Sequence, residues 1–195
     1  MNETTKREGR RLLRPLLQLL VRLRVSPMAV TLTAVPLSIA AAWAFATGRF
    51  ILGGVLVALV GLCDSLDGEL SRMTGTTSDI GAFVDSNVDR LTESFVLTGI
   101  FWYYQPISAW YALLAVLALV FSLMVSYVRA RAEGVGRECR VGFFERPTRV
   151  VLLVFGPVVL GRTYLPYVTG LIALGSLITV IQRIVYVLGQ RRAGA

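Results

Sequence analysis

Long runs of apolar residues dominate the chain, and polar residues collect between them. The runs cover roughly residues 28–47, 51–72, 81–104, 108–132, 148–165 and 167–189. Each is close to or above the ~18–20 residues that an α-helix needs to cross a bilayer. The strict alternation of apolar and polar positions that a membrane β-barrel requires is absent from these runs. The pattern predicts an all-α polytopic membrane protein with six transmembrane helices.

A different pattern precedes the first span. Between residues 10 and 24, leucines and arginines mix at helical spacing. Such a helix lies in the headgroup plane, with its arginines against anionic lipid. The alternative is a signal peptide with its cleavage site at 44–46, but the charged region is too long and five more spans follow. We expect an amphipathic juxtamembrane helix at 1–27 and a six-helix membrane domain at 28–195.

The distribution of basic residues predicts the orientation. The chain has 195 residues, of which 55% are hydrophobic and only 16% charged, against about 25% in soluble domains. With six spans, 18 of its 20 Lys and Arg residues fall on the side that carries both termini. The other side holds only Arg49 and Arg162. By the positive-inside rule both termini are cytoplasmic, and we expect an integral protein of a prokaryotic cell membrane.

The composition also excludes several kinds of chemistry. The chain has no histidine, so it cannot form a Ser-His-Asp triad, a Cys-His dyad or a His-bearing zinc site. Two cysteines, Cys63 and Cys139, are too few for a disulfide framework or an all-thiolate metal site. Nothing in the pattern indicates a nucleic-acid partner.

Carboxylates are concentrated at one place in the second and third spans. Seven of the 12 acidic residues fall between positions 64 and 93. Asp64 and Asp67 are three residues apart and Asp85 and Asp89 four apart, so each pair shares a helix face. A turn near residues 75–77 separates the pairs almost symmetrically, which predicts that they meet at similar depth.

Four carboxylates in a membrane interior point to a metal site. With no cation among them, they would repel each other by several kcal/mol. Oxygen ligands without His or Cys favour Mg²⁺, Mn²⁺ or Ca²⁺, and a pair of such metals serves phosphoryl transfer. Two other classes remain open, a divalent-cation channel or transporter and a non-catalytic scaffold whose acids pair with arginines.

The spacing of these residues carries a family resemblance. Residues 64–72 read DSLDGELSR, and Gly81, Asp85 and Asp89 follow at fixed intervals. The pattern resembles the CDP-alcohol phosphotransferase signature D-x₂-D-G-x₂-A-R-x₈-G-x₃-D-x₃-D. Ser71 replaces the usual alanine, a change between small residues. The six-span outline and basic N-terminus extend the resemblance over nearly the whole chain.

The resemblance implies transfer of a phosphatidyl group from CDP-diacylglycerol to an alcohol, with release of CMP. It implies two divalent ions, Mg²⁺ or Mn²⁺, on Asp64, Asp67, Asp85 and Asp89. Asp89 would also be the catalytic base. The implied nucleotide-binding residues are Thr31, Asp67, Gly68, Ser71, Arg72 and Gly81. Thr31 belongs to an entry motif, residues 26–31, in which Met28 replaces the family's asparagine. The family also implies a homodimer.

Six arginines between positions 129 and 149 suggest a phosphorylated acceptor, because guanidinium forks suit a phosphate monoester. The strings at 126–133 and 145–149 resemble those of phosphatidylinositol-phosphate synthases, which use inositol 1-phosphate. That resemblance implies an acceptor phosphate site formed by Ser126, Arg129, Arg146, Arg149 and Arg183. Glycerol 3-phosphate is the alternative acceptor, and lipid headgroups are the alternative partners of these arginines.

Overall fold

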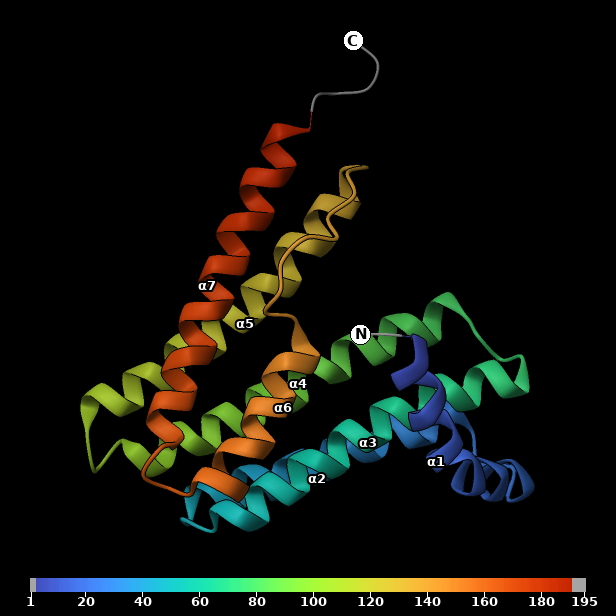
Figure 1. Ribbon diagram of the computed structural model, residues 1–195, viewed down its shortest axis with the longest axis horizontal. Coiled ribbons are helices and arrows are strands. Elements are labelled where there is room, and N and C mark those ends of the chain that lie inside the picture. The colour runs from blue at the N-terminus through green and yellow to red at the C-terminus, as the bar shows by residue number, and fades with distance from the viewer. Residues whose placement is uncertain (1–2, 191–195) are drawn as a thin grey trace.

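The structure, a computed structural model, describes residues 3–190, and their side chains from Leu13 onward. Its elements are α1 (Glu3–Arg22), α2 (Pro27–Ala46), α3 (Phe50–Thr74), α4 (Asp79–Tyr104), α5 (Ala109–Gly134), α6 (Arg146–Phe155), a π-helical turn η1 (Gly156–Leu160) and α7 (Leu165–Gly189). The described residues form helices and no strand, so the all-α prediction is confirmed (Figure 1). Some residues of the charge count lie outside the description: Arg191 and Arg192 wholly, and Lys6, Arg7, Arg10 and Arg11 in their side chains.

Four helices are long and apolar enough to cross a membrane, namely α2, α3, α5 and α7. Helix α4 has 26 residues but carries several acids and an arginine. The continuous fifth helix expected over 148–165 is not formed. Instead α6 ends at Phe155, and η1, which contains Pro157, follows it up to Leu160. These 15 residues rise at most about 22 Å, less than the ~30 Å hydrocarbon core, because the helical segment stops at Gly161, whose φ is 79°.

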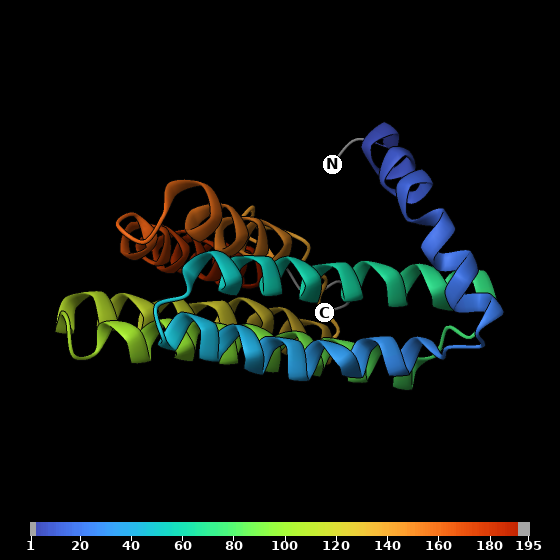
Figure 2. The same ribbon diagram turned by 90° about the horizontal axis from the view of Figure 1, so that it is seen from below.

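Helix α1 leans against the end of α3 (Figure 2). Leu17 is only 2% exposed and forms a small cluster with Leu66 and Leu70 of α3. Other leucines of α1, among them Leu19 and Leu23, are exposed. The leucine-rich face seen in the sequence is therefore divided between packing on α3 and an outward surface.

Helix α2 holds α3 and α4 together. It packs extensively against both, whereas α3 and α4 scarcely touch. The approach of α2 to α4 is closest at Gly99, where an added Cβ would lie 2.3 Å from the carbonyl oxygen of Ala42. Only glycine permits this contact. Because α2 separates its neighbours, α3 and α4 leave open space near the turn that joins them.

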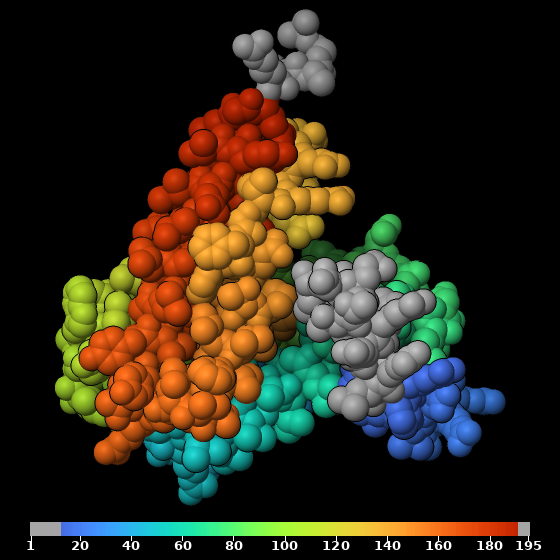
Figure 3. All heavy atoms as spheres, in the orientation of Figure 1, coloured from blue at the N-terminus to red at the C-terminus, as the bar shows by residue number. Residues whose placement is uncertain are grey.

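The helices diverge toward one end of the molecule, which we call the open end. Helices α5 and α7 run side by side and point away from α3 and the start of α4 (Figure 1). The surface is recessed between these two arms (Figure 3). Helix α6 packs against both α3 and α7 near the base of the recess. It therefore carries its first residue, Arg146, to the junction of the two arms.

Candidate active site

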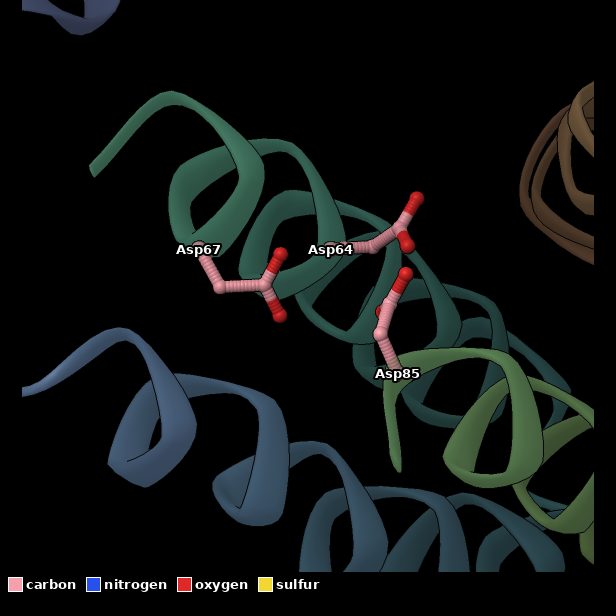
Figure 4. Close-up of side chains that lie close together, drawn as sticks. All are labelled: Asp64, Asp67 and Asp85. Atoms are coloured by element: carbon pink, nitrogen blue, oxygen red, sulfur yellow. The ribbon is translucent and has the colours of Figure 1, made fainter. Parts of the chain in front are cut away.

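Three carboxylates converge where α3 faces α4. Asp64 and Asp67 come from α3 and Asp85 from α4 (Figure 4). One oxygen of each lies within 4.8 Å of the others. The symmetric spacing about the turn therefore brings these side chains together as expected, even though the two helices hardly touch.

Helix α2 supplies a polar contact to this group. The Oγ1 of Thr31 donates a hydrogen bond of 2.6 Å to Oδ2 of Asp67. Asp67 is 5% exposed and Thr31 6%, so little water reaches this carboxylate. The hydrogen bond fixes the rotamer of Asp67 and leaves its other oxygen facing the cluster.

The fourth carboxylate, Asp89, is engaged by an arginine. Arg146 places Nη2 2.8 Å from Oδ1 of Asp89 and Nη1 3.0 Å from Oδ1 of Asp64. The expectation that no cation lies among the four aspartates is therefore wrong. It considered only the second and third spans, whereas the cation arrives from α6, more than fifty residues later.

Acidic residues on one face of α4 pair with arginines of α6. Asp85, Asp89 and Glu93 are spaced by four residues and so lie on one face. Arg149, one turn beyond Arg146, forms a bidentate ion pair with Glu93, with nitrogen–oxygen distances of 2.6 and 2.8 Å. The Arg149 side chain is 1% exposed. This buried pair fixes α6 against α4.

A cavity of about 670 Å³ opens beside the carboxylates, between α2, α3 and α4. Asp67 and Asp85 lie at its inner end. Of the predicted nucleotide-binding residues, it is lined by Thr31, Asp67, Gly68, Ser71 and Gly81. Arg72 is not among the lining residues. Its guanidinium pairs with Glu69 at 2.7 Å.

Several residues that line this cavity were not predicted from the sequence. Most are hydroxyl side chains around the α3–α4 turn, and one is an arginine of the α1–α2 turn: Thr74, Thr76, Thr77, Ser78 and Arg24. The density of threonine and serine at 74–78 was the available signal. Ser78 also begins α4, since its Oγ accepts a hydrogen bond from the backbone N–H of Gly81 at 3.0 Å.

The predicted acceptor residues lie on the opposite arm. The side chain of Arg183 is 3% exposed; it donates to the carbonyl oxygens of Val125 and Val141 and pairs with Glu145 at 3.0 Å. Arg129 is 46% exposed and pairs with Glu133. Both Arg129 and Arg149 lie within electrostatic range of Arg183, and Ser126 is half-buried. The arginines thus form one basic region, in which Arg149 and Arg183 are held by internal partners.

The donor set fits a hard divalent cation. Among the described side chains, those of residues 13–190, Asp67 and Asp85 have no ion-pair partner that would neutralise them. Negative charges this close and this shielded require a counter-charge. Oxygen ligands of this type suit Mg²⁺ or Mn²⁺, so Asp64, Asp67 and Asp85 form a cluster that could hold such an ion.

Comparison with known proteins agrees with this chemistry. The sequence pattern of the CDP-alcohol phosphatidyltransferases matches residues 24–185. Archaetidylinositol phosphate synthase of Methanothermobacter thermautotrophicus is 38% identical over 163 residues, covering 81% of this chain and 80% of that protein. Phosphatidylinositol phosphate synthase of Corynebacterium glutamicum is 34% identical over 88% of this chain and 81% of its own.

Solved structures of Mycobacterium tuberculosis phosphatidylinositol phosphate synthase share the fold at 29% identity. The form with CDP-DAG bound has a TM-score of 0.86 and covers 95% of this chain and 98% of its own. The complex with manganese and citrate has a TM-score of 0.84, with coverages of 93% and 91%. By its sequence, its fold and its carboxylate cluster, the chain belongs to the CDP-alcohol phosphatidyltransferase family.

Proposed function

We propose that this protein transfers the phosphatidyl group of CDP-diacylglycerol to inositol 1-phosphate, giving phosphatidylinositol phosphate and CMP. The observation that carries the proposal is the convergence of Asp64, Asp67 and Asp85 beside a cavity that Asp67 and Asp85 line. Relatives named for archaeal and for bacterial lipids share the inositol phosphate product in their names. This agreement supports inositol 1-phosphate over glycerol 3-phosphate as the acceptor.

The cavity provides the donor site. Its hydroxyl-rich mouth and small residues, Gly68 and Gly81 among them, accommodate a nucleotide, and Arg72 can turn from Glu69 to the diphosphate. The aspartates would hold two divalent ions, which would neutralise the diphosphate and offset the charge that develops on it. Thr31 holds Asp67 in the orientation that such ions need.

Asp89 acts as the general base in this proposal. Its carboxylate lies 2.8 Å from the guanidinium of Arg146. In the reaction its carboxylate takes the proton of the acceptor hydroxyl. The hydroxyl oxygen forms a bond to the phosphatidyl phosphorus, the bond from that phosphorus to the CMP oxygen breaks, and CMP leaves.

The basic arm provides the acceptor site. Ser126, Arg129 and Arg146 have surface available to a soluble phosphate. Arg149 and Arg183 belong to the same site; they contribute charge and, through their internal partners, hold the framework. Arginine forks bind a phosphate monoester more strongly than a neutral alcohol, which is why a phosphorylated acceptor fits this arm.

The membrane arrangement completes the proposal. Helix α4 and the shorter α6–η1 segment join the four long apolar helices to give six membrane segments. Helix α1 lies at the membrane surface, both termini and the active site face the cytoplasm of a prokaryotic cell, and two chains form a homodimer. The surplus of basic residues on one side supports this orientation.

The test is CMP release from CDP-diacylglycerol by the purified protein with Mg²⁺ or Mn²⁺. Inositol 1-phosphate, glycerol 3-phosphate, inositol and serine are offered separately. We expect release with inositol 1-phosphate alone. Release with a different alcohol would refute the acceptor assignment and keep the aspartate site. Failure of folded protein to release CMP with any acceptor would refute the proposed function.

A further inference from the structure

Helix α1 ends in a conformation that glycine favours, yet the residue there is an arginine. The N–H of Val25 bonds to the carbonyl of Leu20, and the N–H of Arg24 to that of Val21. These two bonds define a Schellman motif, in which the residue after the cap is left-handed. Arg24 has φ 53° and is the only non-glycine residue with positive φ within residues 3–190.

The fold itself gives no reason for an arginine at this position. The hydrophobic contact that accompanies such a helix end is made by its neighbours, because Leu20 and Val25 both pack against the Leu17 cluster. Arg24 forms no ion pair or side-chain hydrogen bond with any other described residue. Glycine would adopt the same backbone at lower cost. A residue held in an unfavourable conformation calls for a function of its side chain.

The position of Arg24 indicates what that function is. Arg24 lines the cavity and is the only Lys or Arg among the described residues that do so. It shares the cavity lining with Thr74 and Ser78, each of which is seven residues from the nearest metal-site aspartate along the chain. Seven helical residues span about 10 Å, roughly the distance from a nucleotide's diphosphate to the far edge of its base.

We propose that Arg24 contacts the cytosine of the donor and contributes to the choice of nucleotide. With the diphosphate on the metals at the inner end, the base extends toward the mouth. Cytosine presents two adjacent acceptors there, the O2 carbonyl and the N3 ring nitrogen, which a guanidinium fork meets with two parallel N–H groups. Uracil has a donor at N3 and cannot accept the second bond. The inference rests on the proposed use of a cytidine-diphosphate donor.

The experiment compares CMP and UMP as competitive inhibitors of the Mn²⁺-loaded enzyme, for the wild type and for Arg24→Gly. We expect Arg24→Gly to weaken CMP inhibition about tenfold, as loss of a bidentate base contact does, and to leave UMP inhibition nearly unchanged. The same variant should melt about 2–4 °C higher, because glycine relieves the left-handed strain. Weaker binding by a more stable protein separates a ligand contact from a structural defect.

Two further variants sharpen the test. Arg24→Lys keeps the positive charge but lacks the two parallel N–H groups of a guanidinium. Like Arg24→Gly, it should therefore discriminate less between CMP and UMP than the wild type does. Arg22→Ala removes a charge two residues away that does not line the cavity, and should bind both nucleotides as the wild type does. Equal weakening of CMP and UMP in Arg24→Gly would mean a contact to phosphate alone, and unchanged inhibition a contact to lipid headgroups. Either result overturns the proposal for Arg24. The proposed function is tested separately, by CMP release from the wild type.

Discussion

The two arms of the open end present opposite kinds of binding surface. On the arm of α2, α3 and α4, a cavity of about 670 Å³ is lined by hydroxyls, glycines and aspartates, and Arg24 is the only Lys or Arg among the described residues that line it. On the arm of α5, α6 and α7, arginines predominate, and two of them are buried against acids and backbone carbonyls. One surface is open and acidic, and the other is basic and largely paired.

The difference shows two ways in which a membrane protein can neutralise buried charges, by an external ion or by internal partners. Acids on the first arm require an external cation, since the described part of the chain gives Asp67 and Asp85 no ion pair of their own. Arginines on the second arm are satisfied internally, because an unpaired guanidinium in a low-dielectric interior is costly. Substitutions should therefore damage metal-dependent chemistry on one arm and folding on the other.

The largest expected effect is on the acidic arm. Asp85→Asn should lower transfer by about 10³-fold or more, because a metal ligand and its charge are lost together. The melting temperature should not fall, since one of three mutually repelling carboxylates is removed. CMP release and thermal unfolding in detergent measure the two effects. Asp79→Asn, an exposed acid at the start of α4, is the control, and comparable turnover in the two variants would contradict the site assignment.

The next effect concerns the buried pair of the basic arm. Arg149→Ala should destabilise the protein by about 3–5 kcal/mol, because Glu93 is left buried and unpaired. Arg129→Ala removes an exposed ion pair on the same arm and should change stability by less than about 1 kcal/mol. Unfolding curves of the two variants test the contrast.

A compensating double variant separates this charge effect from a loss of packing. Arg149→Met combined with Glu93→Leu replaces the pair by apolar side chains and should regain most of the lost stability. A double variant as unstable as Arg149→Ala would show that packing, rather than the unpaired acid, dominates.

A smaller effect is expected where α2 supports the metal site. Thr31→Val removes the 2.6 Å hydrogen bond to Asp67 and should weaken Mn²⁺ binding by about 10–100-fold, as loss of a partner that orients a ligand does. Thr33→Val, on the same helix but hydrogen-bonded to a backbone carbonyl, is the matched control. A Mn²⁺ titration followed by electron paramagnetic resonance gives both affinities; indistinguishable values would mean that Thr31 does not orient Asp67.

The smallest effect lies at the junction of the arms. Arg146→Gln removes the cation that bridges Asp64 and Asp89. Mn²⁺ binding without substrates should become tighter by roughly threefold to tenfold, since a partly exposed ion pair no longer competes with the metal. The KM for the phosphorylated acceptor should rise at the same time. Weaker Mn²⁺ binding in this variant would show that Arg146 supports the metal site instead of competing for it.

The sequence predicts the features that depend on one helix or on one turn. The all-α class and the aspartate pairs follow from helical period and from symmetry about residues 75–77, whereas the predicted nucleotide-binding residues follow from the family resemblance. Features that depend on distant segments are not predictable in this way. The meeting of Arg146 with Asp89 requires knowing how α6 packs, and no periodicity encodes it. The interruption at Pro157 is visible in the sequence, but the adjoining apolar residues conceal its effect on helix length.

The bridge from Arg146 to two aspartates has a consequence for the order of events. An arginine that neutralises Asp64 and Asp89 cannot at the same moment hold an acceptor phosphate with the same two nitrogens. In the proposed function, a metal that took the place of Arg146 on these aspartates would free its guanidinium for the acceptor, so metal and acceptor would favour each other's binding. Such coupling is reciprocal: the acceptor would tighten the metal by the same factor by which the metal tightens the acceptor.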